Sequence, residues 1–511
     1  MNCYMGIDLG TSGVKVIVLD ETGRKIAEAN REQTMETPGD GWAQQEPTMW
    51  WENTRQAIRE AAARTAGHEL KGIGLTAQML GATFLDRDLK SIRPCLIWCD
   101  QRSALERDAL ESELGLDYII EKTGNYPLTG YWLPKLKWLE RNEPENYARI
   151  HAVLFPKDYI RLMLTGELVA EVSDGGGSSL FDMDTRQWSW SLIDRMKLPR
   201  HWFARVVESE EVSGHVLPGV AKDLGIPAGV PVVGGGGDQI AGGIGNGVVE
   251  EGVVSSTIGT SGVVFAATDS MKVDHDKRGI HSFCHGIRDK WSVFGCTLAA
   301  GGSYRWARDN LCQEEHNYAR RNGLDVYDVM GLPAAKSPAG SRGLVFLPYM
   351  IGERTPNPDP YAKGVFFGLS LRHDRSDMIR AVMEGVTYSL RDSVEILRGF
   401  GVELRQVRAS GGGGKSPLWR QMQADVFDAE VITLNYDEGP ALGAAILAMV
   451  GTGAYRTAKE ACEDIIKPVS VQEPIRENVA MYQELYDVYR SLYPTLKQTF
   501  ARHAQCEALR R

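Results

Sequence analysis

Short apolar runs alternate with glycine-containing turns at the start of the chain. Residues 4–9 and 14–19 form two such runs, and a turn at 20–23 leads to a third run near residues 25–30. Apolar runs of this length, bounded by turn residues, are typical of β-strands joined as hairpins. The pattern therefore predicts that the chain opens with a β-meander.

Longer segments with apolar residues three and four positions apart predict helices further along. Pro47 begins one that runs to about Thr65, and strands are expected near 72–75 and 92–98, with helices between them. The stretch 173–179 is polar and contains glycines, so we expect a loop there. The alternation of strands and helices predicts an α/β architecture.

The second half of the chain repeats the strand–turn–strand pattern of the opening. The segment Gly10-Thr11-Ser12-Gly13-Val14 recurs as Gly259-Thr260-Ser261-Gly262-Val263, with strand-like runs on both sides of each copy. A five-residue match alone arises easily in a glycine-rich chain, but the shared context indicates that a whole domain is duplicated. We expect two similar α/β domains, residues 1–248 and 249–511, that face each other across a cleft.

The later elements fit this plan. Ser376 and Ser416 are expected to cap two helices, and Pro440 begins a third that is rich in small residues, which allow close packing. A last helix is expected over about 477–493, and Pro494 should end or kink it.

Composition narrows the class of protein. The chain has 511 residues, of which 43% are hydrophobic and 24% charged, and this is ordinary globular composition. Glycine is enriched, at 55 residues. The net charge of −10 argues against broad binding of nucleic acid or of an anionic membrane, although a local site for a small anion remains compatible with it.

Cysteine spacing and hydropathy suggest the cellular setting. Of the eight cysteines only Cys95 and Cys99 lie close together, without a second pair that would complete a zinc site. The chain has no run of 18 apolar residues and no signal-like opening segment. We therefore expect reduced thiols and a cytoplasmic protein.

The two Gly-Thr-Ser-Gly turns are the first candidate for chemistry. Such turns expose backbone amides and hydroxyls that can hold phosphate oxygens, although each turn alone also fits an ordinary hairpin. Asp8 lies two residues before the first turn, where a carboxylate can hold Mg²⁺ through water. The chain has no Gly-x4-Gly-Lys-Ser/Thr sequence, so a pair of facing turns would replace the usual phosphate loop.

Four further segments are candidates. Asp238 follows a glycine run and fits either a turn residue or a base that accepts a hydroxyl proton during phosphoryl transfer. The glycine run 411–414 lies between a strand and a helix, where bare backbone suits either a nucleotide or close packing. The polar segments 76–79 and 98–102 each follow a strand and fit either a cleft or a surface turn.

Taken together, these motifs resemble the FGGY carbohydrate kinases, a branch of the actin-like (ribonuclease H-like) ATPase fold. The resemblance runs from Gly6 to about Gly451. Its motifs are 6–13, 135–139, 235–239, 256–262, 346–349, 352–356, 363–368, 380–386 and the glycine run 411–414. Within the family the chain most resembles the xylulokinases, through His281-Ser282-Phe283-Cys284-His285, Gly352-Glu353-Arg354-Thr355-Pro356 and the segment 156–162.

The resemblance implies two duplicated actin-like ATPase domains and the ATP- and Mg²⁺-dependent phosphorylation of a small ketose or polyol, D-xylulose first among them. It makes Asp238 the catalytic base and lets Asp8 assist Mg²⁺. It also implies two binding sets. Nucleotide and phosphate would meet Thr11, Ser12, Lys15, Gly259, Thr260, Gly301, Gly412 and Gly413, and the sugar would meet Gln78, Met79, Asp238 and Gln239. Neither a nucleic acid nor a membrane is an expected partner, and a homodimer is compatible with the resemblance.

Three positions depart from the xylulokinase pattern. Leu80 stands where histidine is usual, Trp132 where threonine or serine is usual, and Gln239 where many members have asparagine. Leu80 removes a polar group from the sugar site and Trp132 changes the shape of the same wall. The removal of one buried polar group can change discrimination between sugars by orders of magnitude. The sugar is therefore open, and a kinase of ribulose, glycerol or a related polyol is an alternative. A sugar-independent ATPase of the actin or chaperone kind is a second.

Overall fold

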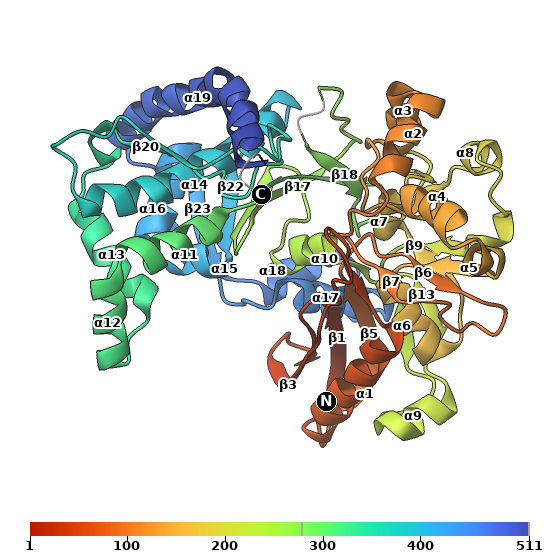
Figure 1. The fold of residues 1–511 in the computed structure, drawn as a ribbon. Coiled ribbons are helices and arrows are strands. Elements are labelled where there is room, and N and C mark those ends of the chain that lie inside the picture. The colour runs from red at the N-terminus through yellow and green to blue at the C-terminus, as the bar shows by residue number, and fades with distance from the viewer. Residues whose placement is uncertain (277–278, 509–511) are drawn as a thin grey trace.

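Two mixed β-sheets of seven strands each form the centre of the molecule within residues 1–276 and 279–508, which the computed structural model describes (Figure 1). The first sheet contains β1 (Asn2–Leu9), β2 (Gly13–Asp20), β3 (Lys25–Glu32), β5 (Glu69–Ala77), β13 (Val212–His215), β14 (Pro231–Val233) and β15 (Gly236–Gly237). The second contains β16 (Val253–Ile258), β17 (Gly262–Thr268), β18 (His281–Cys284), β19 (Trp291–Thr297), β22 (Gln406–Ser410), β23 (Glu430–Leu434) and β24 (Pro468–Gln472).

The strand order shows the expected duplication. In the first sheet, β3, β2 and β1 are antiparallel neighbours, and β5 then pairs with β1 in parallel. In the second sheet, β19, β17 and β16 are antiparallel, and β22 pairs with β16 in parallel. Each Gly-Thr-Ser-Gly segment joins the two strands of a hairpin, and these hairpins, β1–β2 and β16–β17, hold equivalent places in the two sheets. The predicted α/β fold with two similar units is confirmed.

Alternating side chains give the first sheet two buried faces. The odd-numbered residues of β1, such as Met5 and Ile7, pack in one core with Trp50 and Ile58 of helix α1 (Pro47–Ala63). The even-numbered Tyr4 packs in another core on the opposite face, with α17 (Gly439–Gly451). Because side chains alternate along a strand, Gly6 and Asp8 point to the same face as Tyr4.

Helices α10 (Asp238–Gly245) and α17 cross each other between the two sheets, and their backbones are in direct contact at the crossing. A Cβ atom placed on Gly443 would lie 1.8 Å from the carbonyl oxygen of Ala241, and one on Gly245 would lie 1.8 Å from that of Gly439. A Cβ on Gly6 would lie 2.0 Å from the carbonyl oxygen of Ala441. The small residues expected to allow close packing in this helix therefore do so.

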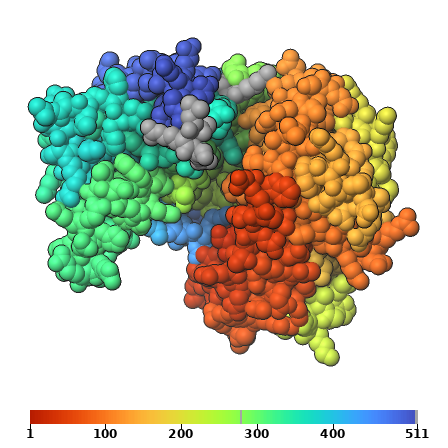
Figure 2. Space-filling view, in the orientation of Figure 1, coloured from red at the N-terminus to blue at the C-terminus, as the bar shows by residue number. Residues whose placement is uncertain are grey.

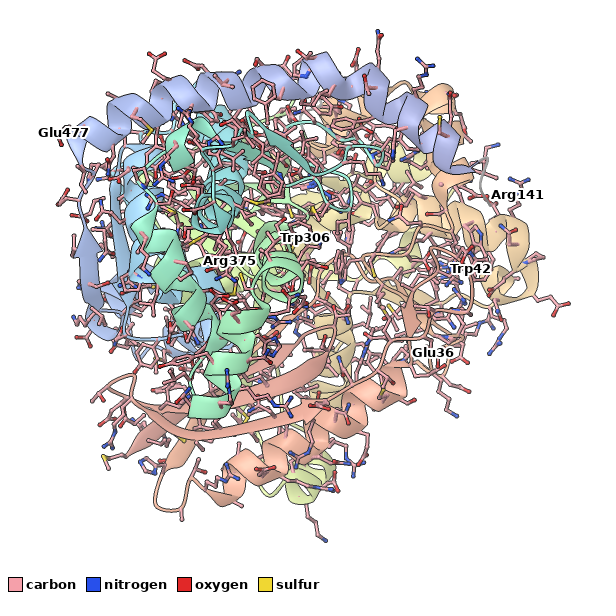
Figure 3. All side chains as sticks on the ribbon, turned by 60° about the vertical axis from the view of Figure 1, so that its left-hand side comes forward. Glu36, Trp42, Arg141, Trp306, Arg375 and Glu477 are labelled. Carbon is pink, nitrogen blue, oxygen red and sulfur yellow. The ribbon has the colours of Figure 1, made fainter. Side chains whose placement is uncertain are left out.

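The remaining helices surround the two main sheets, and only some of them pack directly on a sheet (Figure 1). In the first half of the chain, α6 (Pro156–Thr165) packs on β5 and β13, whereas the others pack on one another, on α1 or on small sheets: α2 (Ala104–Leu114), α3 (Leu116–Thr123), α4 (Trp132–Asn142), α5 (Pro144–Ala148), α8 (Trp190–Arg195) and α9 (Pro218–Leu224). In the second half, α14 (Arg375–Gly399) and α16 (Pro417–Phe427) pack on the second sheet, and α18 (Ala458–Ile465) packs on α17 and α10 between the sheets. The other helices of the second half are α11 (Ala300–Leu311), α12 (Gln313–Asn322), α13 (Val326–Lys336) and α19 (Arg476–Ala508). Figure 3 shows α19 lying along the outside, from the end near Glu477.

Short strands build small sheets beside the main ones. They are β4 (Gln44–Gln45), β6 (Thr83–Leu85), β7 (Cys95–Leu96), β8 (Ala152–Leu154), β9 (Val169–Glu171), β10 (Phe181–Asp182), β11 (Gln187–Trp188), β12 (Arg205–Val207), β20 (Val345–Leu347) and β21 (Val365–Phe367). No helix in the described part of the chain is long and apolar enough to cross a membrane.

Several local predictions are corrected by the structure. The expected loop at 173–179 is mostly helical and buried, in α7 (Val172–Gly175) and the 3-10 turn Gly176–Ser178. Hydrogen bonds within the protein satisfy the side chains of Ser173 and Ser178 there. The long helix α14 is capped by Asp374 instead of Ser376: the Asp374 side chain accepts from two backbone amides.

Two further differences concern the second half. The glycine run 411–414 forms a helical turn, α15 (Gly411–Lys415), and the Ser416 cap that follows it is confirmed. The last helix continues through Pro494 to Ala508 and therefore does not end there. Apolar packing of tyrosines such as Tyr482 and Tyr486 against α14 supports this helix despite the missing backbone donor.

The helix crossing predicts a large cost for a single methyl group. Gly443→Ala should lower the free energy of unfolding by about 3 kcal/mol, because the added Cβ meets backbone atoms that cannot rotate away. The matched control is Gly331→Ala in α13, where a Cβ meets nothing within 4 Å and should stabilise the protein by about 0.5–1 kcal/mol. Denaturant melts of both variants measure this, and equal stability of the two would contradict the backbone contact.

Candidate active site

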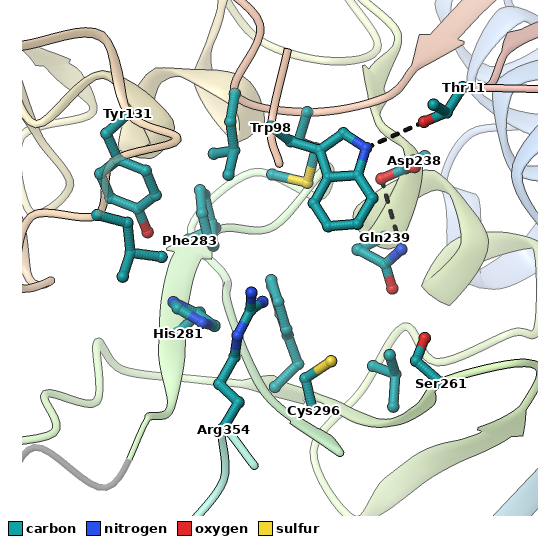
Figure 4. Close-up of a pocket in the computed structure, with 15 residues that line it drawn as sticks. Thr11, Trp98, Tyr131, Asp238, Gln239, Ser261, His281, Phe283, Cys296 and Arg354 are labelled. Atoms are coloured by element: carbon teal, nitrogen blue, oxygen red, sulfur yellow. Dashed lines mark hydrogen bonds between the residues drawn. The ribbon is translucent and has the colours of Figure 1, made fainter. Parts of the chain in front are cut away.

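A pocket of about 230 Å³ opens between elements of the two sheets (Figure 4). Its first wall consists of Thr11, Met79, Leu80, Trp98, Leu128, Tyr131, Asp238 and Gln239, and its second wall of Ser261, Val263, His281, Phe283, Phe294, Cys296 and Arg354. Figure 2 shows the molecular surface hollowed between the orange segment and the green and cyan segments. The pocket therefore brings together Thr11 of the first Gly-Thr-Ser-Gly turn, Ser261 of the second, and Asp238.

Asp238 is the first residue of α10, rather than part of a loop as its glycine neighbours suggested. Its side chain lines the pocket, and the Gln239 amide nitrogen lies 3.5 Å from its carboxylate (Figure 4). Burial raises the pKa of Asp238 to about 7, and the neighbouring Asp8 carboxylate contributes to this rise. A carboxyl with this pKa is suited to accept a proton near neutral pH.

Asp8 lies at the end of β1, on the sheet face that α17 covers. Burial raises its pKa to about 7, against the opposing effect of Lys15, its partner across the β1–β2 hairpin. One buried oxygen, Oδ1 of Asp8, has no hydrogen-bond partner in the described protein, and the same is true of the hydroxyl of Thr76, its neighbour on β5. A carboxylate oxygen left without a partner beside a second carboxylate, Asp238, fits a hydrated cation such as Mg²⁺, which needs few protein ligands.

No group of three or more histidine, cysteine, aspartate or glutamate side chains with metal-binding geometry occurs among the described residues. A dedicated protein cage for a metal ion is therefore not present in that part of the chain. The arrangement at Asp8 instead suits an ion whose remaining ligands come from water and phosphate.

The first turn is fixed by side chains around it. The Gly10 amide donates to the carbonyl of Gly13 at 2.9 Å. The Thr11 hydroxyl accepts from the Trp98 indole at 3.0 Å and donates to Gln78 Oε1 at 3.1 Å (Figure 4). Thr11 is therefore held in one orientation at the edge of the pocket.

The other two predicted residues of this turn differ in their surroundings. Ser12 is exposed at the turn's tip, where its amide and hydroxyl are open to a ligand. Lys15 forms an ion pair with Glu28 at 3.3 Å, so its charge is partly compensated. It remains close enough to Asp8 to oppose the rise in the pKa of that carboxyl.

The second turn lies against the start of helix α11. The Gly259 amide donates to Ser261 O at 2.9 Å, and the Gly301 amide donates to Gly259 O at 2.8 Å. Thr260 is exposed, and its hydroxyl accepts from Arg305 at 3.2 Å. The Gly259 amide is thus already engaged, whereas the exposed Thr260 amide, beside a helix N-terminus, suits an anionic group.

The glycine run 411–414 joins this edge of the second sheet. Gly411 forms a β-bridge with Ile258, the residue just before the second turn. Gly413 is buried, and a Cβ there would lie 2.6 Å from the Ile258 side chain. Gly412 is exposed. The structure therefore gathers the predicted nucleotide residues of the second half at one edge, with Gly412 facing solvent and Gly413 serving the packing.

The predicted sugar residues are only partly in the pocket. Met79 and Gln239 line it, together with Asp238. Gln78 does not line it; its amide donates to Gln45 at 2.7 Å and its oxygen accepts from Thr11. Gln78 therefore supports the turn that carries Thr11.

The residues that depart from the xylulokinase pattern have different positions. Leu80 lines the pocket with a positive φ of 68°, which is rare for leucine, and its carbonyl accepts from the buried Lys135 at 2.8 Å. Trp132 lies behind the wall, where its indole donates to Gly81 O at 2.8 Å and stacks on Phe155. Trp132 thus does not shape the wall directly, contrary to the expectation from its place in the motif.

Three polar residues at the far end of the pocket were not assigned a role from sequence: Tyr131, His281 and Arg354. The Tyr131 hydroxyl and His281 Nε2 are buried without a hydrogen-bond partner among the described residues. Burial, followed by the Arg354 charge, lowers the pKa of His281 to about 3, so the ring is neutral. His281 and Arg354 lie in motifs that carried the family resemblance, whereas nothing in the sequence distinguished Tyr131.

Comparisons with known proteins agree with this geometry. Residues 3–245 match the N-terminal domain of the FGGY family of carbohydrate kinases, and residues 254–452 match its C-terminal domain. The xylulose kinase of Escherichia coli (strain K12) is 37% identical over 498 residues, which cover 96% of this chain and 99% of that protein. The xylulose kinase of Bacillus subtilis (strain 168) is 34% identical over 499 residues, covering 97% and 98%.

A solved structure leads to the same family. The crystal structure of xylulose kinase from Rhodospirillum rubrum superposes with a TM-score of 0.91 at 29% identity, and the match covers 98% of this chain and 100% of that one. The two domain matches, the related sequences and the shared two-sheet architecture indicate one family. The chain belongs to the FGGY family of carbohydrate kinases.

Proposed function

We propose that this kinase transfers the γ-phosphoryl group of ATP to a terminal hydroxyl of D-xylulose, giving D-xylulose 5-phosphate. The observation that carries the proposal is the Asp238 carboxylate, raised in pKa to about 7, in a pocket that also contains Thr11 and Ser261. The similarity to proteins named xylulose kinases, over nearly the whole chain, favours D-xylulose as the sugar.

In this mechanism Asp238 accepts the proton of the attacking hydroxyl. The proton moves from the sugar oxygen to the carboxylate as that oxygen bonds to the γ-phosphorus, and the bond from phosphorus to the β-phosphate oxygen breaks. ADP leaves with the electron pair of that bond. A pKa near the working pH lets Asp238 both accept the proton and return it to water afterwards.

The two turns would hold the phosphates of ATP from opposite sides. In the first turn, Ser12 offers an exposed amide and hydroxyl and Lys15 offers a positive charge. Thr11, whose hydroxyl already donates to Gln78, would contribute its backbone. In the second, Gly259 and Thr260 offer exposed backbone, while Gly301, Gly412 and Gly413 would lie along the nucleotide. Mg²⁺ near Asp8, when bound, would neutralise phosphate charge.

In this proposal the unit of residues 1–248 carries the sugar side and Asp238, and the unit of 249–511 carries the nucleotide side. Because the pocket has walls from both, approach of the two units would narrow it. Closure would exclude water, which otherwise competes with the sugar hydroxyl for the phosphoryl group.

A different pentulose or polyol is the second candidate substrate, and the apolar lining of the pocket supports it. Leu80 gives the pocket an apolar side chain where the xylulokinase pattern has histidine. The wall opposite is also apolar, with Phe283 and Phe294 stacked 5.5 Å apart. Polar contacts to the sugar are therefore concentrated at Asp238, Gln239 and the far end of the pocket.

A panel of sugars tests the proposal. ADP release should be fastest with D-xylulose, compared with ribulose, glycerol and related polyols, at least about ten-fold in kcat/KM. A pyruvate kinase–lactate dehydrogenase coupled assay measures it. Equal turnover of several substrates would contradict a dedicated xylulokinase, and ADP release that ignores every sugar would support an ATPase.

Removal of the base gives a second prediction. Asp238→Ala should lower kcat by about 10³-fold because the pocket then lacks the proposed proton acceptor, while the Kd for ATP stays within about three-fold. In the parent enzyme, kcat/KM should fall as the pH drops through about 7, since protonated Asp238 cannot act as a base. Near-normal turnover of Asp238→Ala would remove Asp238 from the mechanism.

Asp238→Asn serves as the control for folding. The pKa of Asp238 in the folded protein lies above that of an aspartate in the unfolded chain. Between these two pKa values only the folded state keeps the carboxyl protonated, so the parent loses stability as the pH rises toward 7. The asparagine variant lacks this loss and should be more stable than the parent at pH 8, by about 2 kcal/mol. Thermal melts at pH 5 and pH 8 measure the difference.

Leu80 gives a prediction about specificity. Leu80→His should fold normally, because histidine tolerates a positive φ better than leucine, and it should raise kcat/KM for D-xylulose by about ten-fold through a new hydrogen bond. Leu80→Met keeps the wall apolar and should leave the ranking of sugars unchanged. The sugar panel measures both variants, and an identical ranking for all three proteins would remove residue 80 from sugar recognition.

A further inference from the structure

The backbone just before Asp238 is held from its buried side. It is the glycine run 234–237, which has no side chains of its own to fix its path. The Gly235 amide donates to Ser209 O at 2.8 Å, and the Gly237 amide donates to the hydroxyl of Ser173 at 3.0 Å. The Gly234 carbonyl accepts from the guanidinium of Arg161. Hydrogen bonds from residues distant in sequence therefore determine where helix α10 begins.

Ser173 is oriented by Glu171, the N-cap residue of α7. Its hydroxyl donates to Glu171 Oε2 at 2.8 Å, which turns the oxygen lone pairs toward Gly237. The other oxygen, Glu171 Oε1, accepts from the Ser173 amide at 2.8 Å and from the Ser209 hydroxyl at 2.5 Å. Each of these side chains is fully buried, so the Ser173 hydroxyl has no competing contact with solvent.

A cluster of buried charges anchors Glu171. Lys157 Nζ lies 3.3 Å from Glu171 Oε2, 2.9 Å from Asp158 Oδ1 and 2.8 Å from Asp174 Oδ2. Arg161 pairs with Asp158 at 2.6 Å and also reaches the glycine run. A buried cluster of this kind is costly to desolvate and is fixed in geometry by its mutual pairing. It gives Ser173 and Arg161 a rigid base.

We propose that Ser173, held by Glu171 and Lys157, is a positioning residue that sets the place and direction of the Asp238 carboxylate through the amide of Gly237. The inference rests on the proposed function of Asp238 as the base. A glycine run is the most flexible backbone the chain can have. A misplacement of about 1 Å at a reacting group can cost about 100-fold in rate. The buried hydrogen bond restricts the glycine run where the chemistry requires a fixed distance.

Ser173→Ala tests the inference, with Ser178→Ala as the matched control. Both serines are buried in the same segment, but the Ser178 hydroxyl donates to Gly175 O and accepts from the Leu180 amide, with no contact to the glycine run. Ser173→Ala should lower kcat by about 10–100-fold, with KM for sugar and ATP within about three-fold. Ser178→Ala should keep kcat within about two-fold, whatever its loss of thermal stability.

Kinetics measured per folded protein add a readout that general destabilisation would not move. That readout is the split between kcat and KM, because misplacement of Asp238 slows the chemical step in Ser173→Ala, whereas a general loss of stability only lowers the folded fraction of either variant. If Ser173→Ala does not fold, Ser173→Cys keeps nearly the same volume and replaces the hydroxyl with a weaker acceptor for the Gly237 amide, and a fall in kcat is again expected.

Asp238→Ala is measured in the same assay to separate the two claims. If it retains turnover, the proposed base is wrong. If it is inactive while Ser173→Ala keeps kcat within about two-fold of the parent, the base stands and the positioning role is overturned. An equal loss of kcat in Ser178→Ala would also overturn it, because the effect would then not depend on Gly237.

Discussion

The contact between the backbones of α10 and α17 is the constraint on which the rest of the structure depends. At Gly443 and Gly245 the two helices approach so closely that a single methyl group would overlap a carbonyl oxygen. Helix α17 packs against β1 and β5 of the first sheet, and α10 also contacts β17 of the second. This crossing places the N-terminus of α10, and therefore Asp238, beside the face of β1 that carries Asp8.

The crossing also explains why two carboxylates meet in a poorly hydrated place. Asp8 and Asp238 each have a pKa raised to about 7, mainly by burial, and the Asp8 charge contributes to the rise at Asp238. A positive charge near Asp8 would favour the ionised form of both groups. The net charge of −10 is therefore no obstacle to an anionic substrate, because the groups proposed to meet the phosphates, namely backbone amides, Lys15 and a cation, would act locally at the turns.

Periodicity and repetition predicted most of the fold, because strands and amphipathic helices bury regular patterns of side chains. The duplicated hairpins at Gly10 and Gly259 were visible as a repeated pentapeptide. The buried helical turns at 173–178 were not, because a polar, glycine-rich segment has no apolar pattern and its burial depends on partners distant in sequence, such as Gly237. The family resemblance assigned Gln78 to the sugar, and nothing in the sequence indicated that its amide donates to Gln45.

The site divides into parts that depend differently on side chains. The surfaces proposed for phosphate are largely backbone at glycine turns, where Gly259 and Gly301 keep their hydrogen bonds whatever the neighbouring side chains are. The surface proposed for the sugar consists of side chains, among them Leu80, whose backbone is in a strained conformation. It also includes His281 and Tyr131, which each have a buried polar atom without a hydrogen-bond partner among the described residues. Substitution can therefore alter the sugar pocket and leave the phosphate turns intact. Motifs dominated by glycine and the two aspartates accordingly help to identify the family, whereas the choice of sugar would depend on a few side chains through their geometry in the proposed sugar pocket.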